Sequence, residues 1–135
     1  MEKFDAIVIG AGPAGCSAAL VMAKAGLQVL VVERGSYAGA KNISGGILYG
    51  KVLNDLIPKF WEEAPIERSI DRHVTAFLSE KSSVAIDFKS GDLSKPPYNA
   101  VSILRAKFDK WFAEKVEQAG ATVVTNICVD DLLWR

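Results

Sequence analysis

The hydrophobic and polar positions at the start of the chain predict a strand, a helix and a second strand. Residues 4–9 end in the apolar run Ala-Ile-Val-Ile, which is typical of a strand buried on both faces in a parallel sheet. Residues 13–25 predict a helix, and we expect its small side chains to pack close to that sheet; these are Ala14, Ala18, Ala19 and Ala25. Gly26 is placed to end the helix, and residues 27–32 are apolar again. The pattern therefore indicates a βαβ unit of about 30 residues.

Two later patterns predict a hairpin and a second long helix. Residues 74–78 and 84–88 are largely apolar and flank the polar segment 80–83, which is typical of two antiparallel strands. A helical stripe follows, and it consists of Phe108, Trp111, Phe112, Val116 and Ala119. We expect this stripe to face the core and Asp109 to face solvent. Gly120 would end the helix before a strand at 121–127. We expect an incomplete α/β domain in which an antiparallel sheet begins at about residues 70–100.

The turn between the first strand and the first helix carries a glycine motif. Its residues are Gly10, Ala11, Gly12, Pro13, Ala14 and Gly15, and Glu33 ends the second strand. GxGxxG in this context, with an acid about 20 residues further on, is typical of a Rossmann-like dinucleotide site. The glycines permit a tight turn, a close approach of the pyrophosphate and close packing of helix on strand, while the acid binds the ribose diol. A carboxylate at that position disfavours NADP. The alternative is a tight connection followed by a solvated acid.

Composition narrows the functional class. Half of the 135 residues are hydrophobic, and 16 basic side chains balance 16 acidic ones. We therefore expect one domain with no preference for nucleic acid. Cys16 and Cys128 form no CxxC pair, His73 is the only histidine, and we predict no metal site. We expect Cys16 to be a buried packing residue and the chain to be neither exported nor membrane-spanning.

The sequence resembles a family of flavoproteins. The stretches GAGPAG, ERG, AGAKNISGGILYG and ILRAKFDKWFAEKVEQAGA are similar to those of FixC proteins and electron transfer flavoprotein–quinone oxidoreductases, which are related to geranylgeranyl reductases. The resemblance covers essentially the whole chain, and it implies FAD as the cofactor. Because these relatives are longer, we expect residues 1–135 to be the N-terminal part of an FAD-binding domain.

The resemblance also implies a role for particular residues. The glycine turn would hold the FAD pyrophosphate, and Glu33 of the ERG stretch would hold the adenosine ribose. Arg34 of the same stretch is a further expected cofactor-binding residue. Arg105 would contact the pyrophosphate, and Val129 would lie near adenine. The remaining implied site residues form a loop beside the flavin, and they are Lys41, Asn42, Gly45 and Gly46.

The residues themselves leave alternatives open for these last assignments. Lys41 would place positive charge near a reduced flavin, and the alternative is a solvated loop lysine. Gly45 and Gly46 would bring backbone amides to a cofactor or only turn the chain. Arg105 suits phosphate because it is a planar bidentate donor, and the alternative is a surface ion pair.

The sequence therefore predicts an FAD-dependent oxidoreductase with no assigned catalytic side chain, because the flavin itself carries the redox chemistry. By resemblance, its partners would be electron transfer flavoprotein subunits and a ferredoxin-like protein, with a quinone as a further acceptor. The alternatives are a geranylgeranyl reductase-like enzyme and a truncated dinucleotide-binding module without turnover. We expect a cytoplasmic location, with peripheral association at the inner face of the membrane as an option.

Overall fold

The computed structural model describes residues 3–134, which form two compact units. The first unit comprises residues 3–45 and 104–134, and the second comprises residues 46–103. The first unit contains β1 (Ala6–Ile9), α1 (Pro13–Lys24), β2 (Val29–Val32), α3 (Arg105–Gln118) and β8 (Thr122–Val124). Its sheet has the order β1-β2-β8, and all of its strand pairs are parallel. The predicted βαβ unit and the later helix and strand are thus confirmed.

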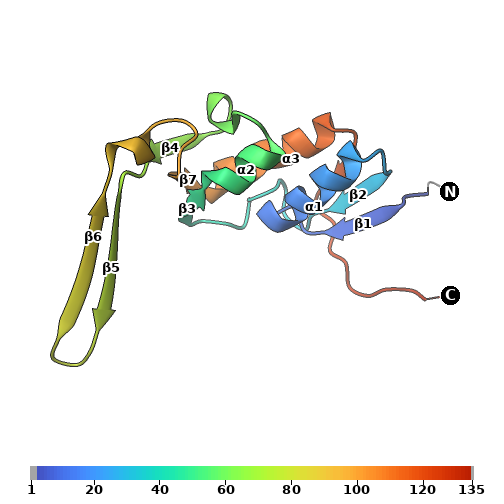
Figure 1. Ribbon diagram of the computed structural model, residues 1–135. Coiled ribbons are helices and arrows are strands. Elements are labelled where there is room, and N and C mark those ends of the chain that lie inside the picture. Colours follow the sequence, from blue (N-terminus) through green and yellow to red (C-terminus); the bar gives the residue numbers. More distant parts are fainter. Residues whose placement is uncertain (1–2, 135) are drawn as a thin grey trace. The chain divides into compact units, whose positions relative to one another are not determined.

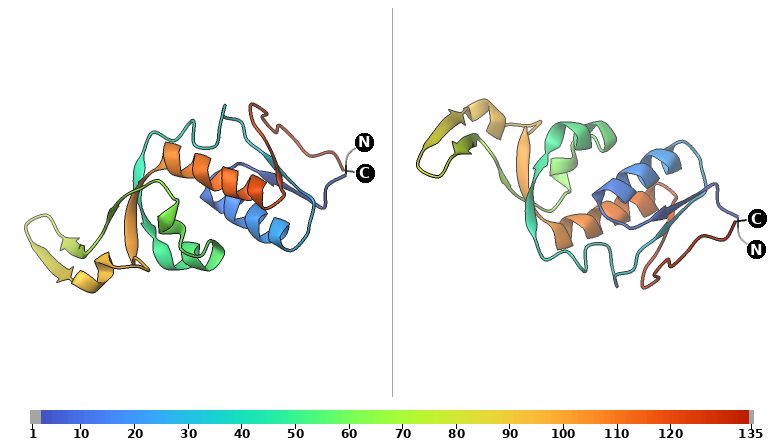
Figure 2. Two further views of the ribbon diagram at one scale, coloured as in Figure 1. Left: turned by 90° about the horizontal axis from the view of Figure 1, so that it is seen from above. Right: turned by 90° about the horizontal axis from the view of Figure 1, so that it is seen from below.

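The two helices of the first unit pack against each other and lie side by side over one face of the sheet (Figures 1 and 2). Successive parallel strands joined by right-handed crossovers in one direction place both helices on the same face. Gly26 follows α1 with φ +88°, a left-handed conformation that glycine adopts without a steric penalty. Its predicted role in ending the helix is confirmed.

The prediction that β1 is buried on both faces was wrong. Val8 faces α1, because a Cβ built at Gly15 would lie 3.2 Å from a Val8 methyl group. Ile7 and Ile9 point to the opposite face and are 62% and 59% exposed. Within residues 3–134 the helices of this unit cover only one face of the sheet.

The buried face of α1 also differs from the prediction. Ala14 and Ala18 are exposed, whereas Cys16, Ala19 and Leu20 are buried. Ala25 is exposed as well, so only Ala19 among the four predicted alanines lies in the core. Small size alone does not show which side of a helix meets the sheet.

Helix α3 carries the aromatic core that its spacing predicts. Phe108, Phe112 and Val116 are at most 2% exposed, and the Phe108 and Phe112 rings meet edge to face with centroids 5.8 Å apart. Asp109 contradicts the prediction, because its exposed fraction is 0%. It lies seven residues before Val116, which is two helical turns, and it therefore shares the buried face.

The second unit is mainly antiparallel. Its strands are β3 (Gly45–Tyr49), β4 (Ile66–Ser69), β5 (Arg72–Leu78), β6 (Ser83–Lys89) and β7 (Ala100–Leu104), and its helices are α2 (Gly50–Leu56) and the short 3₁₀ turns Phe60–Glu62 and Gly91–Ser94. One sheet has the order β3-β7-β4, and β5 pairs with β6 over seven residue pairs from Arg72↔Lys89 to Leu78↔Ser83. The predicted hairpin is confirmed.

Within residues 3–134, no helix has the length and apolar character required to cross a membrane.

Candidate functional site

The glycine turn shapes the end of β1 and the start of α1. Gly10 has φ +98°, and its N–H donates to the Val32 carbonyl at 2.7 Å, which ties the turn to β2. A Cβ on Gly15 would overlap the Gly10 carbonyl oxygen, so that α1 can approach this turn only with glycine at position 15. The predicted roles of these two glycines in turning and packing are confirmed.

The N-terminus of α1 has no capping side chain. Gly12 is the N-cap, Pro13 follows it, and the first turn contains no acidic residue. The backbone N–H groups of such a turn have no intrahelical partners and carry the positive end of the helix dipole. This end of α1 is therefore suited to an anion.

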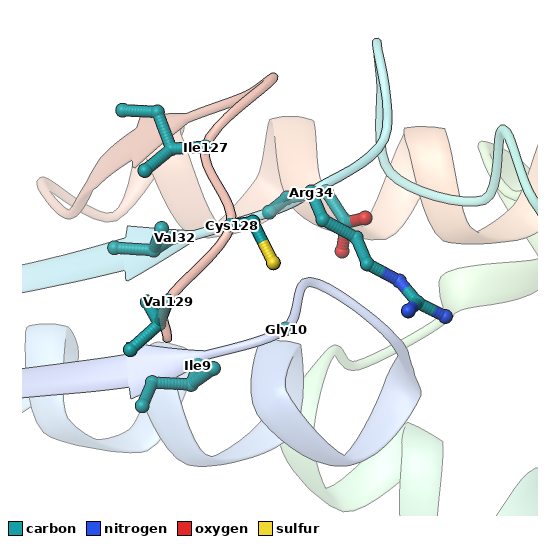
Figure 3. A pocket seen from close by; sticks show the side chains of 8 residues that line it. Ile9, Gly10, Val32, Arg34, Ile127, Cys128 and Val129 are labelled. Carbon is teal, nitrogen blue, oxygen red and sulfur yellow. The ribbon is translucent and has the colours of Figure 1, made fainter. Parts of the chain in front are cut away.

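A cavity of about 290 Å³ lies at the carboxyl ends of the parallel strands. Its lining consists of Ile9, Gly10, Val32, Glu33, Arg34, Ile127, Cys128 and Val129. Figure 3 shows the side chains of Ile9, Val32, Ile127 and Val129 gathered on one side, while the Arg34 guanidinium extends past the glycine turn. In open α/β sheets, ligands bind in the crevice outside the carboxyl ends of the strands. The cavity combines an apolar wall with the Glu33 carboxylate, as a nucleoside requires.

Glu33 connects the glycine turn to the segment that follows β2. Its Oε2 accepts a hydrogen bond from the Ala11 N–H at 2.9 Å, and its Oε1 accepts one from the Gly35 N–H at 2.7 Å. A carboxylate has about four lone-pair positions, and two of them are used here. The remaining acceptor positions of this half-buried side chain are available for hydroxyl donors.

Arg105 lies beside the N-terminus of α1 and is held by Asp109. The Arg105 Nη2 atom is 3.8 Å from the position that a Cβ on Gly12 would occupy. Arg105 Nε and Nη2 each donate to Asp109 at 2.8 Å, and the Asn42 Nδ2 atom donates to Asp109 Oδ2 at 2.9 Å. The hydrogen bonds to Asp109 raise the pKa of Arg105 above its ordinary value, and so this residue remains a cation.

Burial raises the pKa of the Cys16 thiol to about 12, and the Asp109 and Glu33 carboxylates add to this effect. Cys16 is 1% exposed, and its Sγ contacts the Ala11 carbonyl oxygen at 3.4 Å. The thiol is therefore protonated at neutral pH and is a packing residue, as predicted.

The structure brings together some of the predicted site residues and separates others. Gly10, Glu33, Arg34 and Val129 line the cavity, and Ala11, Gly12, Pro13, Ala14, Gly15 and Arg105 lie at the adjoining turn and helix end. Asn42 contacts Asp109, and Lys41 is exposed in the same loop. Gly45 and Gly46 begin strand β3, so they extend the chain and do not turn it.

The prediction from sequence missed Asp109 and the Cys128 position on the cavity wall. Asp109 had a detectable signal, because it follows Arg105 by four residues on a helix, the spacing of an ion pair. Among the described residues, no group of three or more His, Cys, Asp or Glu side chains could hold a metal ion.

The chain is similar to several known proteins. Residues 5–94 match the model of the family FAD dependent oxidoreductase. The chain is 52% identical to "Protein FixC" of Escherichia coli O157:H7 over 99% of this chain and 31% of that protein. It is 48% identical to "Probable electron transfer flavoprotein-quinone oxidoreductase YdiS" of Escherichia coli (strain K12), over 98% of this chain and 31% of that protein.

Solved structures agree with the fold. A geranylgeranyl bacteriochlorophyll reductase-like protein from Thermoplasma acidophilum superimposes with a TM-score of 0.68 and 30% identity, over 93% of this chain and 30% of that one. The chain thus spans about a third of the length of the relatives that it matches. With its family match over residues 5–94 and its parallel βαβ unit, the chain belongs to the FAD dependent oxidoreductase family.

Proposed function

We propose that the protein is a FixC-type flavoprotein that accepts electrons from an electron transfer flavoprotein and passes them to a quinone or a ferredoxin-like protein. The observation that carries the FAD-binding part of this proposal is the cavity at the carboxyl ends of β1 and β2, with Glu33 on its wall. The name of the similar quinone oxidoreductase supports the choice of an electron transfer flavoprotein and a quinone as the two reaction partners.

The residues of the first unit fit the adenosine and pyrophosphate parts of FAD. The uncapped end of α1, with no side chain at Gly12 and a guanidinium beside it, suits two phosphates. Glu33 would accept hydrogen bonds from the ribose hydroxyls, and Val129 with its apolar neighbours would contact adenine. FAD supplies the electron-accepting ring system, while these residues bind and orient the cofactor.

The loop residues Lys41, Asn42, Gly45 and Gly46 belong to the proposal as the segment beside the flavin. Lys41 is exposed, and a cation there would stabilise negative charge on a reduced flavin. Asn42 has a structural role in this segment, because its Nδ2 atom donates a hydrogen bond to Asp109 and so fixes the loop.

The role of Glu33 can be tested by substitution in the full-length protein. Replacing Glu33 with Ala removes charge-assisted hydrogen bonds to ribose, which are worth about 1.5–3 kcal/mol, and we expect FAD affinity to fall at least tenfold. Titration of the apoprotein with FAD, followed by flavin fluorescence, measures this change. Glu80→Ala is the control, because Glu80 is an exposed residue between β5 and β6. Equal FAD affinity of the Glu33→Ala variant and the wild type would contradict the assignment.

The electron donor and acceptor can be tested by anaerobic mixing. Reduced electron transfer flavoprotein from the same organism should bleach the visible FAD band of the full-length protein. A quinone analogue or an oxidised ferredoxin should then restore it. If the FAD band is unchanged by the reduced partner but the protein reduces a prenyl double bond, electron transfer between flavoproteins is not its function.

That second outcome would establish the alternative function, a geranylgeranyl reductase-like enzyme. The observation that favours this alternative is the 30% identity and 0.68 TM-score to the reductase-like protein from Thermoplasma acidophilum. Both functions use the same FAD site, and so the Glu33→Ala experiment does not distinguish between them.

A further inference from the structure

Asp109 is a fully buried carboxylate that accepts hydrogen bonds from Arg105 and Asn42, two of the residues proposed for the cofactor site. Its exposed fraction is 0%, and it is the only buried polar or charged residue of the described core. Oδ1 accepts from Arg105 Nε, and Oδ2 accepts from Arg105 Nη2 and from Asn42 Nδ2. Burying a carboxylate carries a large desolvation penalty, which a pairing of this quality offsets. An apolar side chain at position 109 would avoid that penalty.

The pair with Asp109 fixes the plane and direction of the Arg105 guanidinium. Two parallel hydrogen bonds leave a planar group little freedom, and they occupy two of its five N–H donors. The remaining donors belong to a side chain that is 29% exposed and whose Nη2 lies beside Gly12. An arginine that is already held in place loses less conformational freedom when it binds phosphate than a free one.

Asp109 also fixes the loop that follows β2. Gly39 has φ +91°, and a Cβ built on it would lie 2.9 Å from the Asp109 Cβ. Asn42, three residues further on, donates to the same carboxylate. One side chain of α3 thus sets the position of the arginine and of the loop residues 39–42.

We propose that Asp109 is a positioning residue for pyrophosphate, which holds the Arg105 guanidinium beside the N-terminus of α1 so that its free N–H groups meet the phosphates of FAD. This inference rests on the proposed function, because it requires Arg105 to contact the cofactor. Asp109 itself does not touch the phosphates and acts only through Arg105. A purely structural ion pair would instead stabilise the fold and leave the affinity for FAD unchanged.

A double-mutant cycle on the full-length protein tests this. We compare Asp109→Asn, Arg105→Ala and the double variant, and Glu114→Gln provides a matched loss of charge at an exposed position of α3. The affinity of each folded apoprotein for FAD is titrated by flavin fluorescence, and the phosphorus NMR signals of bound FAD report on the pyrophosphate. We expect Asp109→Asn to weaken FAD binding about tenfold and to shift these signals. In the Arg105→Ala background, Asp109→Asn should change the affinity by less than about twofold.

A second variant covers the case in which Asp109→Asn does not fold. Arg105→Lys keeps a cation next to Asp109 but cannot form two parallel hydrogen bonds, and we expect about tenfold weaker FAD binding from it. An affinity within twofold of wild type for either single variant, Asp109→Asn or Arg105→Lys, would overturn the inference. Additive effects of Asp109→Asn and Arg105→Ala on the affinity would also overturn it.

The outcomes separate the inference from the proposed function. If the wild-type protein binds no FAD, the proposed function fails and the inference fails with it. If the wild type binds FAD and Arg105→Ala binds it equally well, FAD binding stands and the inference is wrong.

Discussion

Gly15 has the strictest requirement for glycine among the residues of the turn. Any side chain at this position would collide with the Gly10 carbonyl group, and backbone atoms cannot move away as a flexible side chain can. We expect Gly15→Ala to lower the free energy of unfolding by about 3 kcal/mol, the upper range for overpacking. Denaturant unfolding followed by circular dichroism measures this change.

Gly46→Ala is the matched control for that substitution. A Cβ at Gly46 meets no atom within 4 Å, and Gly46 lies in strand β3. Its free energy of unfolding should stay within about 0.5 kcal/mol of wild type, as for surface changes. Equal stability of the two variants would show that the close contact of α1 with the glycine turn is not required.

The two cysteines should differ in reactivity. At pH 8 a thiol reagent should modify the exposed Cys128 and leave Cys16 unmodified until the protein unfolds. The pKa of Cys16 is raised from 9.0 to about 12 in the folded protein, and so the native state keeps its proton over a range in which the unfolded state loses it. The contribution of Cys16 to the free energy of unfolding is therefore fully present below pH 9 and is lost as the pH rises toward 12. If a Cys128→Ser variant still reacted rapidly with the thiol reagent at pH 8, Cys16 would not be protected from the reagent as predicted.

At the scale of elements, the hairpin β5–β6 presents an apolar face to solvent. Residues directly opposite in an antiparallel pair share a face, and Phe77 pairs with Val84 while Thr75 pairs with Ile86. Phe77, Val84, Ile86 and Phe88 are all at least 56% exposed. The other face carries the Arg72–Asp87 ion pair. Such a patch binds apolar dyes and promotes association.

We expect a polypeptide of residues 1–135 to bind the dye ANS at this face. The double substitution Phe77→Thr and Ile86→Thr removes apolar surface and places a β-branched side chain, which favours strands, at both positions, so that the hairpin persists. Dye fluorescence should fall in this variant and remain unchanged in Ala76→Ser, which alters the other face. Equal fluorescence of the double variant and the unmodified polypeptide would place the dye-binding surface elsewhere.

The elements that could be predicted from the sequence have a strong hydrophobic periodicity or a glycine that ends them. These are β1, α1, β2, the hairpin, α3 and β8, whose apolar patterns extend over several residues or end at Gly26 and Gly120. Helix α2 was missed because it has only seven residues and no capping side chain. Strand β4 was missed because its sequence, Ile-Glu-Arg-Ser, has one apolar residue, and its pairing with β7 depends on backbone hydrogen bonds.

The candidate site was predictable where it depends on the turn, and less so where it depends on tertiary contacts. Gly10, Gly15 and Glu33 follow from spacing alone. The burial of Asp109 depends on the loop that carries Asn42, which lies 67 positions earlier in the chain. The exposure of Ile7 and Ile9 was not predictable, because an apolar run does not reveal whether both faces of a strand are covered.

At the scale of the whole molecule, the residues proposed for adenosine diphosphate all belong to the first unit, and the hairpin belongs to the second. The cavity of about 290 Å³ is lined only by residues of the first unit. ADP contains the adenine, the ribose and the two phosphates of that half of FAD. Binding of ADP should therefore depend on the first unit and be independent of β5 and β6.

We expect ADP to compete with FAD for the full-length apoprotein. Replacing residues 74–87 with a short glycine-rich turn should leave the dissociation constant of ADP within about twofold, because none of these residues lines the cavity. Glu33→Ala should raise the dissociation constant of ADP at least tenfold, since the ribose hydroxyls lose a charged acceptor. Calorimetric titration with ADP measures both dissociation constants. Glu80→Ala in the wild-type background is the control for Glu33→Ala, because Glu80 is an exposed acid outside the cavity. It is not combined with the hairpin replacement, which removes Glu80. Equal losses of ADP affinity in the Glu33→Ala protein and in the hairpin-replaced protein would mean that the second unit contributes to the nucleotide site.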